Sequence, residues 1–143
     1  MREILFRGKC KSTGEWVEGY FVTVDPVDMP NRIRKPKAVI FPIDAKCNWF
    51  NKYFYSAREV VPETVGQFTG LLDKNGKKIF EGDIFVYYYN NSRGKEKVDF
   101  YIVTYDDEYG IWQPFGDSGC GFDPKRVVII DNIHDNPKLP EVK

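Results

Sequence analysis

The stretch FTGLLDKNGKKIFEGDIF, from Phe68 to Phe85, decides the fold. Apolar residues on either side of Asp73–Gly76 (DKNG) predict two strands joined by a turn. Asn-Gly is the strongest short-range hairpin signal, because both residues adopt positive φ at low energetic cost. Glu81–Asp83 (EGD) makes a second corner before the apolar run IFVYYY at residues 84–89. The two corners predict a tightly folded β ribbon.

The chain after this ribbon continues in the same style. Short runs rich in β-branched and aromatic residues alternate with polar or glycine-rich turns, at residues 84–89, 98–107, 109–115 and 125–131. Four or five short strands at this spacing predict a small barrel. An aromatic content of 16% fits the same conclusion, because aromatic side chains favour the pleated, half-buried surface of a sheet.

The first half of the chain is also predicted to be β-rich. Residues 2–9 and 15–24 read as two strands joined by a turn, and residues 38–43 as a third. Residues 47–60 fit either a helical face or a bent strand, and we favour the strand. The predicted fold is therefore mostly β. It has an N-terminal β-rich lobe at 1–66 and a small barrel with a C-terminal tail at 67–143.

The charge balance bears on the kind of partner. The chain has 21 Lys and Arg against 21 Asp and Glu, so bulk electrostatic binding of nucleic acid is not its expected main activity. The two halves differ. Residues 1–62 hold 11 basic and 7 acidic side chains, and residues 63–143 hold 10 and 14. This charge polarity has three explanations: head-to-tail association of copies, a basic binding face on the first half, or chance.

The sequence predicts a cytoplasmic location. No apolar run approaches the roughly 20 residues that a membrane helix needs, so no membrane contact is expected. The N-terminus lacks the apolar core of an export signal. The cysteines, Cys10, Cys47 and Cys120, are odd in number and far apart in sequence, which does not suit a disulfide framework.

Motifs for calcium and nucleotides fail on specific residues. In a calcium loop that begins at Asp73, positions 5 and 6 are Lys77 and Lys78, and lysine cannot ligate a cation. A phosphate-binding loop needs a hydroxyl after its lysine, whereas Lys77 is followed by Lys78. We therefore expect no cofactor and no small-molecule substrate.

Catalytic constellations are weak as well. One alternative pairs His134, the one histidine, with Cys120, which lies between two glycines. The favoured explanation is a cysteine in a turn and a histidine that caps one. The three cysteines and His134 are the residue types of a Cys₃His zinc site, but no two cysteines have the close spacing in sequence that usually builds such a site. The acidic run Asp106–Glu108 is best explained as a solvated corner. We expect no enzymatic activity and no metal site.

Binding surfaces are better supported. A basic loop precedes the third strand, and a second basic turn follows the run at 84–89. On that run Phe85, Tyr87 and Tyr89 share one face, and Ile84, Val86 and Tyr88 share the other. Exposed aromatic residues beside basic loops suit either single-stranded nucleic acid or a subunit interface. The candidate binding residues are Arg32, Arg34, Lys35, Lys37, Tyr87, Tyr89, Arg93 and Lys95.

Three segments resemble the YopX-like family of phage and prophage proteins. They are MREILFRGK at the N-terminus, VPETVGQFTGLLDKNGKKIFEGDI at Val61–Ile84, and NIHDNP near the C-terminus. The segments stand in the order that the family has and span nearly the whole chain. The resemblance implies an N-terminal β lobe joined to a C-terminal SH3-like barrel, and an origin in a bacteriophage or prophage. It brings no catalytic residues.

Together these features predict a phage or prophage accessory protein that binds or self-assembles and is not an enzyme. The expected partner is a second copy of the chain, with a host or phage protein as a further possibility. The alternative is a nucleic-acid-binding module that uses the basic loop and the aromatic residues of the barrel.

Overall fold

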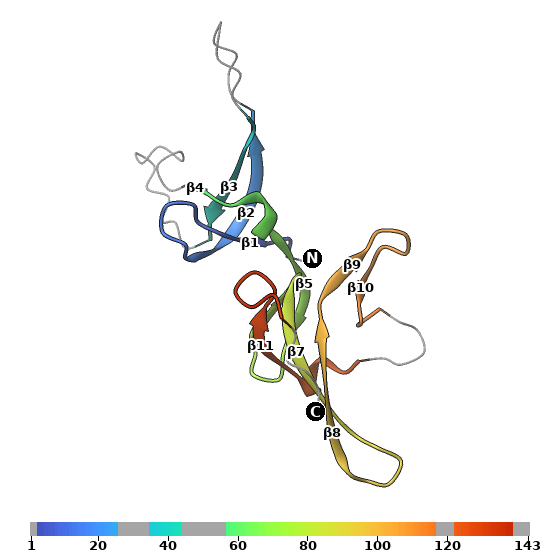
Figure 1. The fold of residues 1–143 in the computed structure, drawn as a ribbon. Coiled ribbons are helices and arrows are strands. Elements are labelled where there is room, and N and C mark those ends of the chain that lie inside the picture. Colours follow the sequence, from blue (N-terminus) through green and yellow to red (C-terminus); the bar gives the residue numbers. More distant parts are fainter. Residues whose placement is uncertain (1–2, 26–34, 44–56, 117–121, 139–143) are drawn as a thin grey trace, which may run out of the picture. The chain divides into compact units, whose positions relative to one another are not determined.

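The computed structural model describes residues 3–25, 35–43, 57–116 and 122–138. Strands dominate these ranges, so the prediction of a mostly β protein is confirmed (Figure 1). The chain divides into two compact units, Met1–Gln67 and Phe68–Lys143.

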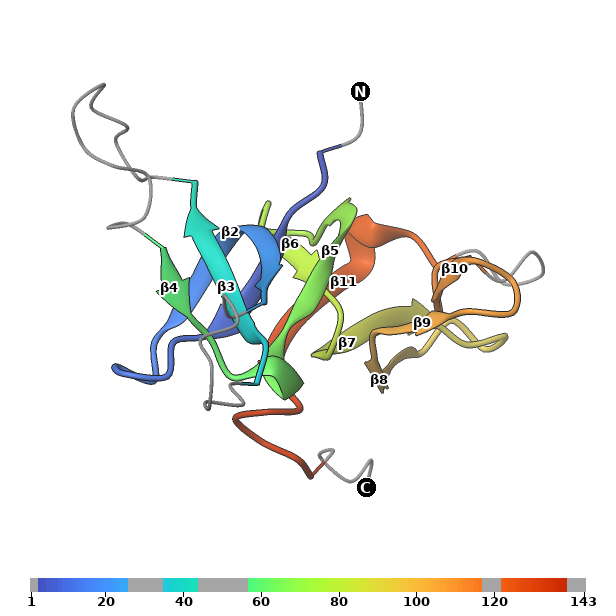
Figure 2. The ribbon, with the colours of Figure 1, turned by 90° about the horizontal axis from the view of Figure 1, so that it is seen from above.

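The first unit contains four consecutive strands of a six-stranded antiparallel sheet, in the order β4-β3-β2-β1, and the sheet continues through β5 (Gly66–Leu72) and β6 (Lys78–Phe80). The strands are β1 (Phe6–Lys9), β2 (Trp16–Val24), β3 (Lys37–Pro42) and β4 (Arg58–Glu59), with a 3-10 helix at Pro62–Thr64. Figure 2 shows β2, β3 and β4 side by side. The core consists of Ala38, Ile40 and Val60, against which Phe6, Val17, Phe21 and Val65 pack. Burial of these side chains holds the unit together.

The ambiguous region at residues 47–60 is settled only at its end. Arg58 and Glu59 pair with β3, and Val60 forms a β-bridge with Cys10. The extended conformation that we favoured is therefore confirmed for these residues. Residues 44–56 lie outside the described part of the chain.

The quoted ribbon begins with β5 (Gly66–Leu72), whose first residues pair with β1 and whose later ones pair with β6 (Lys78–Phe80). The connecting loop runs from Asp73 to Lys77. The Asp73 N–H donates to the Lys77 carbonyl at 2.8 Å, and Gly76 has a φ of +79°. The predicted turn is confirmed, with the whole Asp73–Lys77 segment forming the loop.

The side chain of Asp73 organises this loop. Its Oδ1 accepts hydrogen bonds from the N–H groups of Asn75 at 2.8 Å and Lys77 at 2.9 Å. Its Oδ2 accepts one from the N–H of Ile129 at 3.1 Å, 56 residues away in sequence. Asp73 is buried, and its carboxylate connects the loop to the backbone of Ile129. The sequence placed Asp73 in the turn and excluded it as a calcium ligand, but it did not predict the bond to Ile129.

We expect Gly76→Ala to lower the free energy of unfolding by about 1 kcal/mol. A Cβ at Gly76 meets no atom within 4 Å, so its effect comes from the positive φ, which an L-residue adopts at a cost of roughly 1–2 kcal/mol. Stiffening of the unfolded chain offsets part of that cost. Thermal and urea unfolding measure the change. A variant as stable as the parent would show that this loop is wrongly described.

The second unit is built on a three-stranded sheet in the order β11-β7-β8. Its strands are β7 (Asp83–Asn90), β8 (Glu96–Ile102) and β11 (Val127–Asn132); β9 (Thr104–Asp106) and β10 (Ile111–Gln113) form a separate pair. The core consists of Ile79, Phe85, Val103, Val127 and Ile129, surrounded by half-buried Leu71, Tyr87, Tyr101, Trp112, Phe115 and Phe122.

The described strands form no closed barrel, so the SH3-like barrel is not confirmed. The physical reason lies in the partners of β5 and in the path of the chain after β8. β5 pairs with β1 at one end and β6 at the other, and the chain after β8 turns into the β9–β10 hairpin instead of continuing around the core. Short strands of even spacing indicate neither of these choices.

Two of the segments that carry the family resemblance meet in the second unit. Gly82 takes a φ of +82°, and its carbonyl accepts a hydrogen bond from the N–H of Ile133 at 2.9 Å. The Asn132 Oδ1 accepts from the N–H groups of His134 and Asp135, both at 3.0 Å. The two segments, Glu81–Asp83 (EGD) and Asn132–Pro137 (NIHDNP), therefore form the two sides of one corner. His134 lies in a turn that Asn132 caps.

Candidate functional site

The predicted binding residues fall into two groups. Arg32 and Arg34 lie outside the described residues. Lys35 and Lys37 belong to the first unit, where both are exposed. Tyr87, Tyr89, Arg93 and Lys95 belong to the second unit and share the β7–β8 hairpin.

Lys37 is engaged within the first unit. Its Nζ lies 3.0 Å from Glu59 Oε2, while the Lys11 Nζ lies 2.9 Å from Glu59 Oε1. Hydrogen bonds from Lys11 and Lys37 hold the pKa of the Glu59 carboxyl below its usual value. Lys37 therefore contacts the edge strand β4 through Glu59 and also presents a positive charge. An exposed salt bridge of this kind contributes little to stability.

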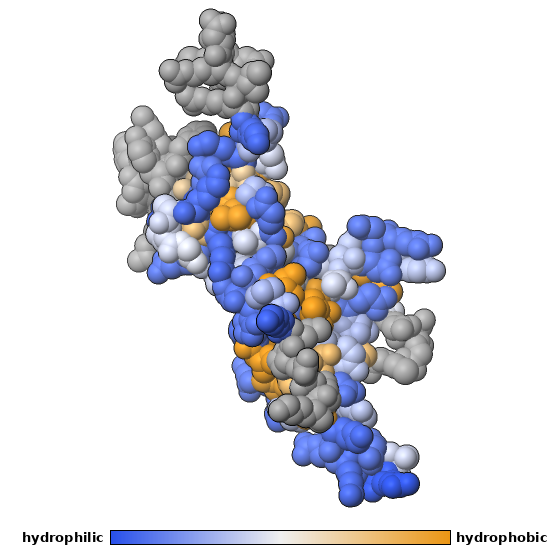
Figure 3. Space-filling view, in the orientation of Figure 1, coloured by the Kyte–Doolittle hydropathy of each residue, from blue (hydrophilic) through white to orange (hydrophobic). Residues whose placement is uncertain are grey.

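The β7–β8 hairpin presents its basic residues on a well-defined loop. The Asn91 Oδ1 accepts from the N–H groups of Arg93 and Lys95, both at 3.0 Å, and Gly94 has a φ of +73°. The Asp73–Lys77 loop has the same bonds at the same spacing. Arg93 and Lys95 are exposed, and Figure 3 shows a hydrophilic surface where Figure 1 places this turn.

The tyrosines on the same hairpin differ in their surroundings. Tyr87 stacks on Tyr89 with ring centroids 6.3 Å apart and packs against Phe122 at 4.5 Å. Its Oη also accepts from the N–H of Asp123 at 3.4 Å. A hydrogen bond to Asp99 raises the pKa of the Tyr89 hydroxyl, because that bond favours the protonated form. Tyr87 is therefore mainly a packing residue, and Tyr89 is the outer member of the stack.

The predicted alternation of faces along residues 84–89 holds, but exposure to solvent alternates only in the second half of β7. Ile84 and Phe85 point to opposite faces and are both fully buried, so neither face is exposed at the start of the strand. From Tyr87 onward the pattern alternates, and Tyr88 is 37% exposed. The sheet is covered on both faces near the core and on one face near the hairpin loop.

The uncovered face has a residue that inspection of the sequence missed. Val98 lies directly opposite Tyr88 and is 38% exposed. The next pair along this face is Val86 and Phe100, and Val86 also lies opposite Val128 on β11. Alternation in KVDFYI places Val98 and Phe100 on one face, but their exposure depends on what packs there.

β8 is the outermost strand of its sheet. The order β11-β7-β8 leaves the far side of residues 96–102 without a neighbouring strand among the residues that the structure describes. Figure 1 shows the β8 arrow along the side of this sheet. An edge strand exposes N–H and C=O groups that can pair with another chain. The hairpin therefore combines an open edge, a partly exposed apolar face and a charged loop.

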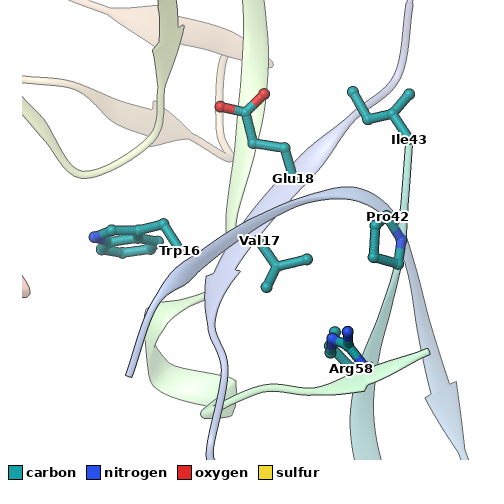
Figure 4. Close-up of a pocket in the computed structure, with 6 residues that line it drawn as sticks. All are labelled: Trp16, Val17, Glu18, Pro42, Ile43 and Arg58. Atoms are coloured by element: carbon teal, nitrogen blue, oxygen red, sulfur yellow. The ribbon is translucent and has the colours of Figure 1, made fainter. Parts of the chain in front are cut away.

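A pocket of about 400 Å³ lies in the first unit. Its lining residues are Trp16, Val17, Glu18, Pro42, Ile43 and Arg58. Figure 4 shows Val17, Pro42 and Arg58 around the hollow and Trp16 turned away from it. Trp16 is held elsewhere, since the Arg7 guanidinium lies 4.7 Å from its ring centroid. Its described lining residues offer an apolar wall with one carboxylate and one guanidinium, and none of them is a nucleophile.

The structure describes only some of the candidate catalytic and metal-ligating residues. Cys47 and Cys120 lie outside the described residues, so the structure does not test the Cys120–His134 pairing or a zinc site that uses them. Among the residues that are described, no group of His, Cys, Asp or Glu is placed to hold a metal ion. Asp106 closes the β9–β10 turn by accepting from the N–H groups of Glu108 and Tyr109.

Cys10 is buried at the start of the loop after β1. Its Sγ lies 3.3 Å from the Ser12 hydroxyl. Hydrogen bonds from the hydroxyls of Ser12 and then Thr13 lower the pKa of the Cys10 thiol to about 7. The N–H of Cys10 donates to the Glu15 carbonyl, so the residue also closes the loop.

A family comparison accounts for nearly the whole chain. The model of the family described as YopX protein matches residues 5–141. The chain belongs to the YopX family. The residues that resemble this family in sequence include the β5–β6 loop and the Gly82 corner, which are structural elements in the fold.

The comparison with solved structures finds similar chains, one of them from Enterococcus faecalis. Protein EF1440 from Enterococcus faecalis, known from a crystal structure, is 22% identical to this YopX-family chain, with 96% of this chain and 98% of that one covered and a TM-score of 0.49. No curated protein matches. Within the described ranges, no helix has the length and apolar character that a membrane crossing requires.

Proposed function

We propose that this YopX-family chain is a non-enzymatic accessory protein of a phage or prophage that acts in the host cytoplasm by self-association. The observation that carries the proposal is the open edge of β8 beside the exposed pair Tyr88 and Val98. The phage or prophage setting rests on the sequence resemblance.

Exposed edges favour association for a simple reason. The backbone groups of an edge strand are already extended and aligned, so a second strand pairs with them at little conformational cost. Proteins that stay monomeric commonly protect such edges with proline, a bulge or charged side chains. β8 contains no proline, and its register with β7 runs from Glu96 to Ile102 without a bulge. It carries Glu96, Lys97 and Asp99, so the pairing of these charges decides whether a second strand is accepted.

Light scattering coupled to size-exclusion chromatography tests the proposal on the full chain. We expect a dimer or larger species at micromolar concentration that dissociates on dilution. A monomer at high micromolar concentration contradicts self-association. A pull-down from host lysate, with half of the sample treated with nuclease, then identifies other partners.

A second candidate function is binding of single-stranded nucleic acid at the same hairpin. The half-buried ring of Tyr89 lies opposite exposed Lys97, and Arg93 and Lys95 follow on the loop. Stacking on aromatic rings beside basic side chains is how such strands are bound without sequence preference. Asp99, bonded to Tyr89, weakens this case because a carboxylate repels phosphate.

The Arg93→Ala/Lys95→Ala variant separates the two functions. If these side chains contact phosphates, the slope of log K against log salt falls by about 1.4 for single strands. Asn75→Ala/Lys77→Ala is the matched control, because it changes the equivalent positions of the other loop. Fluorescence anisotropy with labelled oligonucleotides measures the slopes. No binding by the parent protein at low salt removes this function.

A further inference from the structure

We propose that two copies of the chain pair through their β8 strands, antiparallel, about a two-fold axis at Val98. The result is one continuous sheet in which the β8 strands of both copies lie at the centre. This inference rests on the proposed self-association and specifies its interface and register.

The hydrogen bonds of β8 decide which residues face outward. The Val103 N–H donates to the Asp83 carbonyl at 2.9 Å, and the same register continues as Phe85 with Tyr101 and Tyr87 with Asp99. Hydrogen-bonded pairs recur at every second residue in an antiparallel ladder. The backbone groups of residues 97, 99 and 101 therefore face β7. Those of Glu96, Val98 and Phe100 face away from it.

With the axis at Val98, the outward-facing backbone groups of the two strands pair with one another. Val98 of each copy lies opposite Val98 of the other, and each Glu96 lies opposite a Phe100. Each of these pairs exchanges hydrogen bonds in both directions, giving roughly six backbone hydrogen bonds. A shift of the register by one residue would bring inward-facing groups opposite outward-facing ones and lose these bonds.

Charge selects this register over its neighbours. With the axis at Val98, Lys97 of each copy lies opposite Asp99 of the other, at positions where the side chains of a ladder are closest. A shift by two residues keeps the hydrogen bonds, but it places Lys97 opposite Lys97 or Asp99 opposite Asp99. Opposite charges across strands stabilise a sheet and like charges destabilise it. The alternation of sign in β8 therefore fits a single arrangement.

The apolar face supports the same arrangement. Val98 is 38% exposed and Tyr88, its neighbour on β7, is 37% exposed. Pairing at Val98 sets the two valines side by side between the two tyrosines. Four partly exposed side chains then form one continuous apolar row, and each covers part of the next. Removal of this surface from water favours the dimer.

Charge reversal tests the register. Lys97→Asp places a second carboxylate opposite each Asp99 of the dimer, so we expect the dimer dissociation constant to rise at least tenfold. Asp99→Lys has the same effect by placing two lysines opposite each other. The Lys97→Asp/Asp99→Lys double variant restores both pairs and should return to within about threefold of the parent. Lys95→Asp is the control, because position 95 lies opposite Tyr101 in this register and should change the constant less than threefold.

Val98→Pro tests the strand pairing itself. Proline is tolerated on an edge strand where its missing N–H faces solvent, so the monomer keeps its ladder with β7. The dimer loses the bonds at its axis, and we expect only monomer by light scattering. Amide NMR signals from β7 confirm that each variant is folded.

The outcomes separate the two proposals. A parent protein that is monomeric overturns self-association and this interface together. A parent dimer that Lys97→Asp and Val98→Pro leave unchanged overturns the β8 interface and leaves self-association in place. Weakening by either single charge reversal without recovery in the double variant also contradicts the register.

Discussion

Replacement of Phe85 by alanine is expected to lower the free energy of unfolding of residues 68–143 by about 4 kcal/mol. Phe85 is fully buried, and its ring centroid lies 5.5 Å from Tyr101, 5.4 Å from Phe115 and 6.3 Å from Phe122. Truncation removes apolar burial, leaves a cavity and ends these ring contacts at once.

Tyr88→Ala is the control for that experiment. Tyr88 lies on the same strand but is 37% exposed, so in dilute monomeric protein its loss should lower stability by roughly 1 kcal/mol or less. Urea unfolding, followed through amide NMR signals of β7 and β11, reports on this unit alone. Equal effects of the two substitutions would show that Phe85 is not at the centre of the core.

The second large effect is expected for Asp73→Ala, at about 3 kcal/mol. The substitution leaves the N–H groups of Asn75, Lys77 and Ile129 without their carboxylate acceptor. Hydrogen bonds to a charged group contribute roughly 1.5–3 kcal/mol each, and a buried donor without an acceptor adds a desolvation cost. Water replaces the acceptor for the loop N–H groups more easily than for the N–H of Ile129.

Asn91→Ala is the matched control for Asp73→Ala. Asn91 accepts the same two loop bonds, from Arg93 and Lys95, on an exposed hairpin. It should lower stability by about 1 kcal/mol. Asp73→Asn should fall between the two, because its amide keeps the Oδ1 bonds but turns a donor toward the Ile129 N–H. If Asp73→Ala equals Asn91→Ala in urea unfolding, the bond to Ile129 contributes nothing.

The accuracy of the sequence predictions follows the range of the interactions involved. The loops were predictable because their signals are local: Asn75-Gly76 marked the first turn and the polar run at residues 90–97 the second. The structure adds that the side chain of the first residue, Asp73 or Asn91, closes each loop. The barrel was not predictable, because closure depends on which distant strands meet. The chain supplies strands of suitable length, but β5 pairs with β1, and β9 pairs with β10.

The candidate site shows the same division. Tyr89, Arg93 and Lys95 were predicted, and the structure places them on one hairpin. Tyr87 lies on the same hairpin with its ring against Phe122, and its binding role stays a prediction. Val98 was missed because alternation gives the face of a residue and not what covers that face. Arg32 and Arg34 lie outside the described residues and stay predictions.

The sequence by itself determined the strand-rich character, the turns and the family membership, because these depend on local backbone preference and on the order of motifs. The tertiary structure decided that Asp73 ties its loop to β11 and that both faces of β7 are buried at Phe85. It also decided that β8 is an edge strand among the described strands. These features arise from contacts between residues far apart in the chain. Burial and edge position belong to the packed sheet, and no single strand carries them in its own sequence.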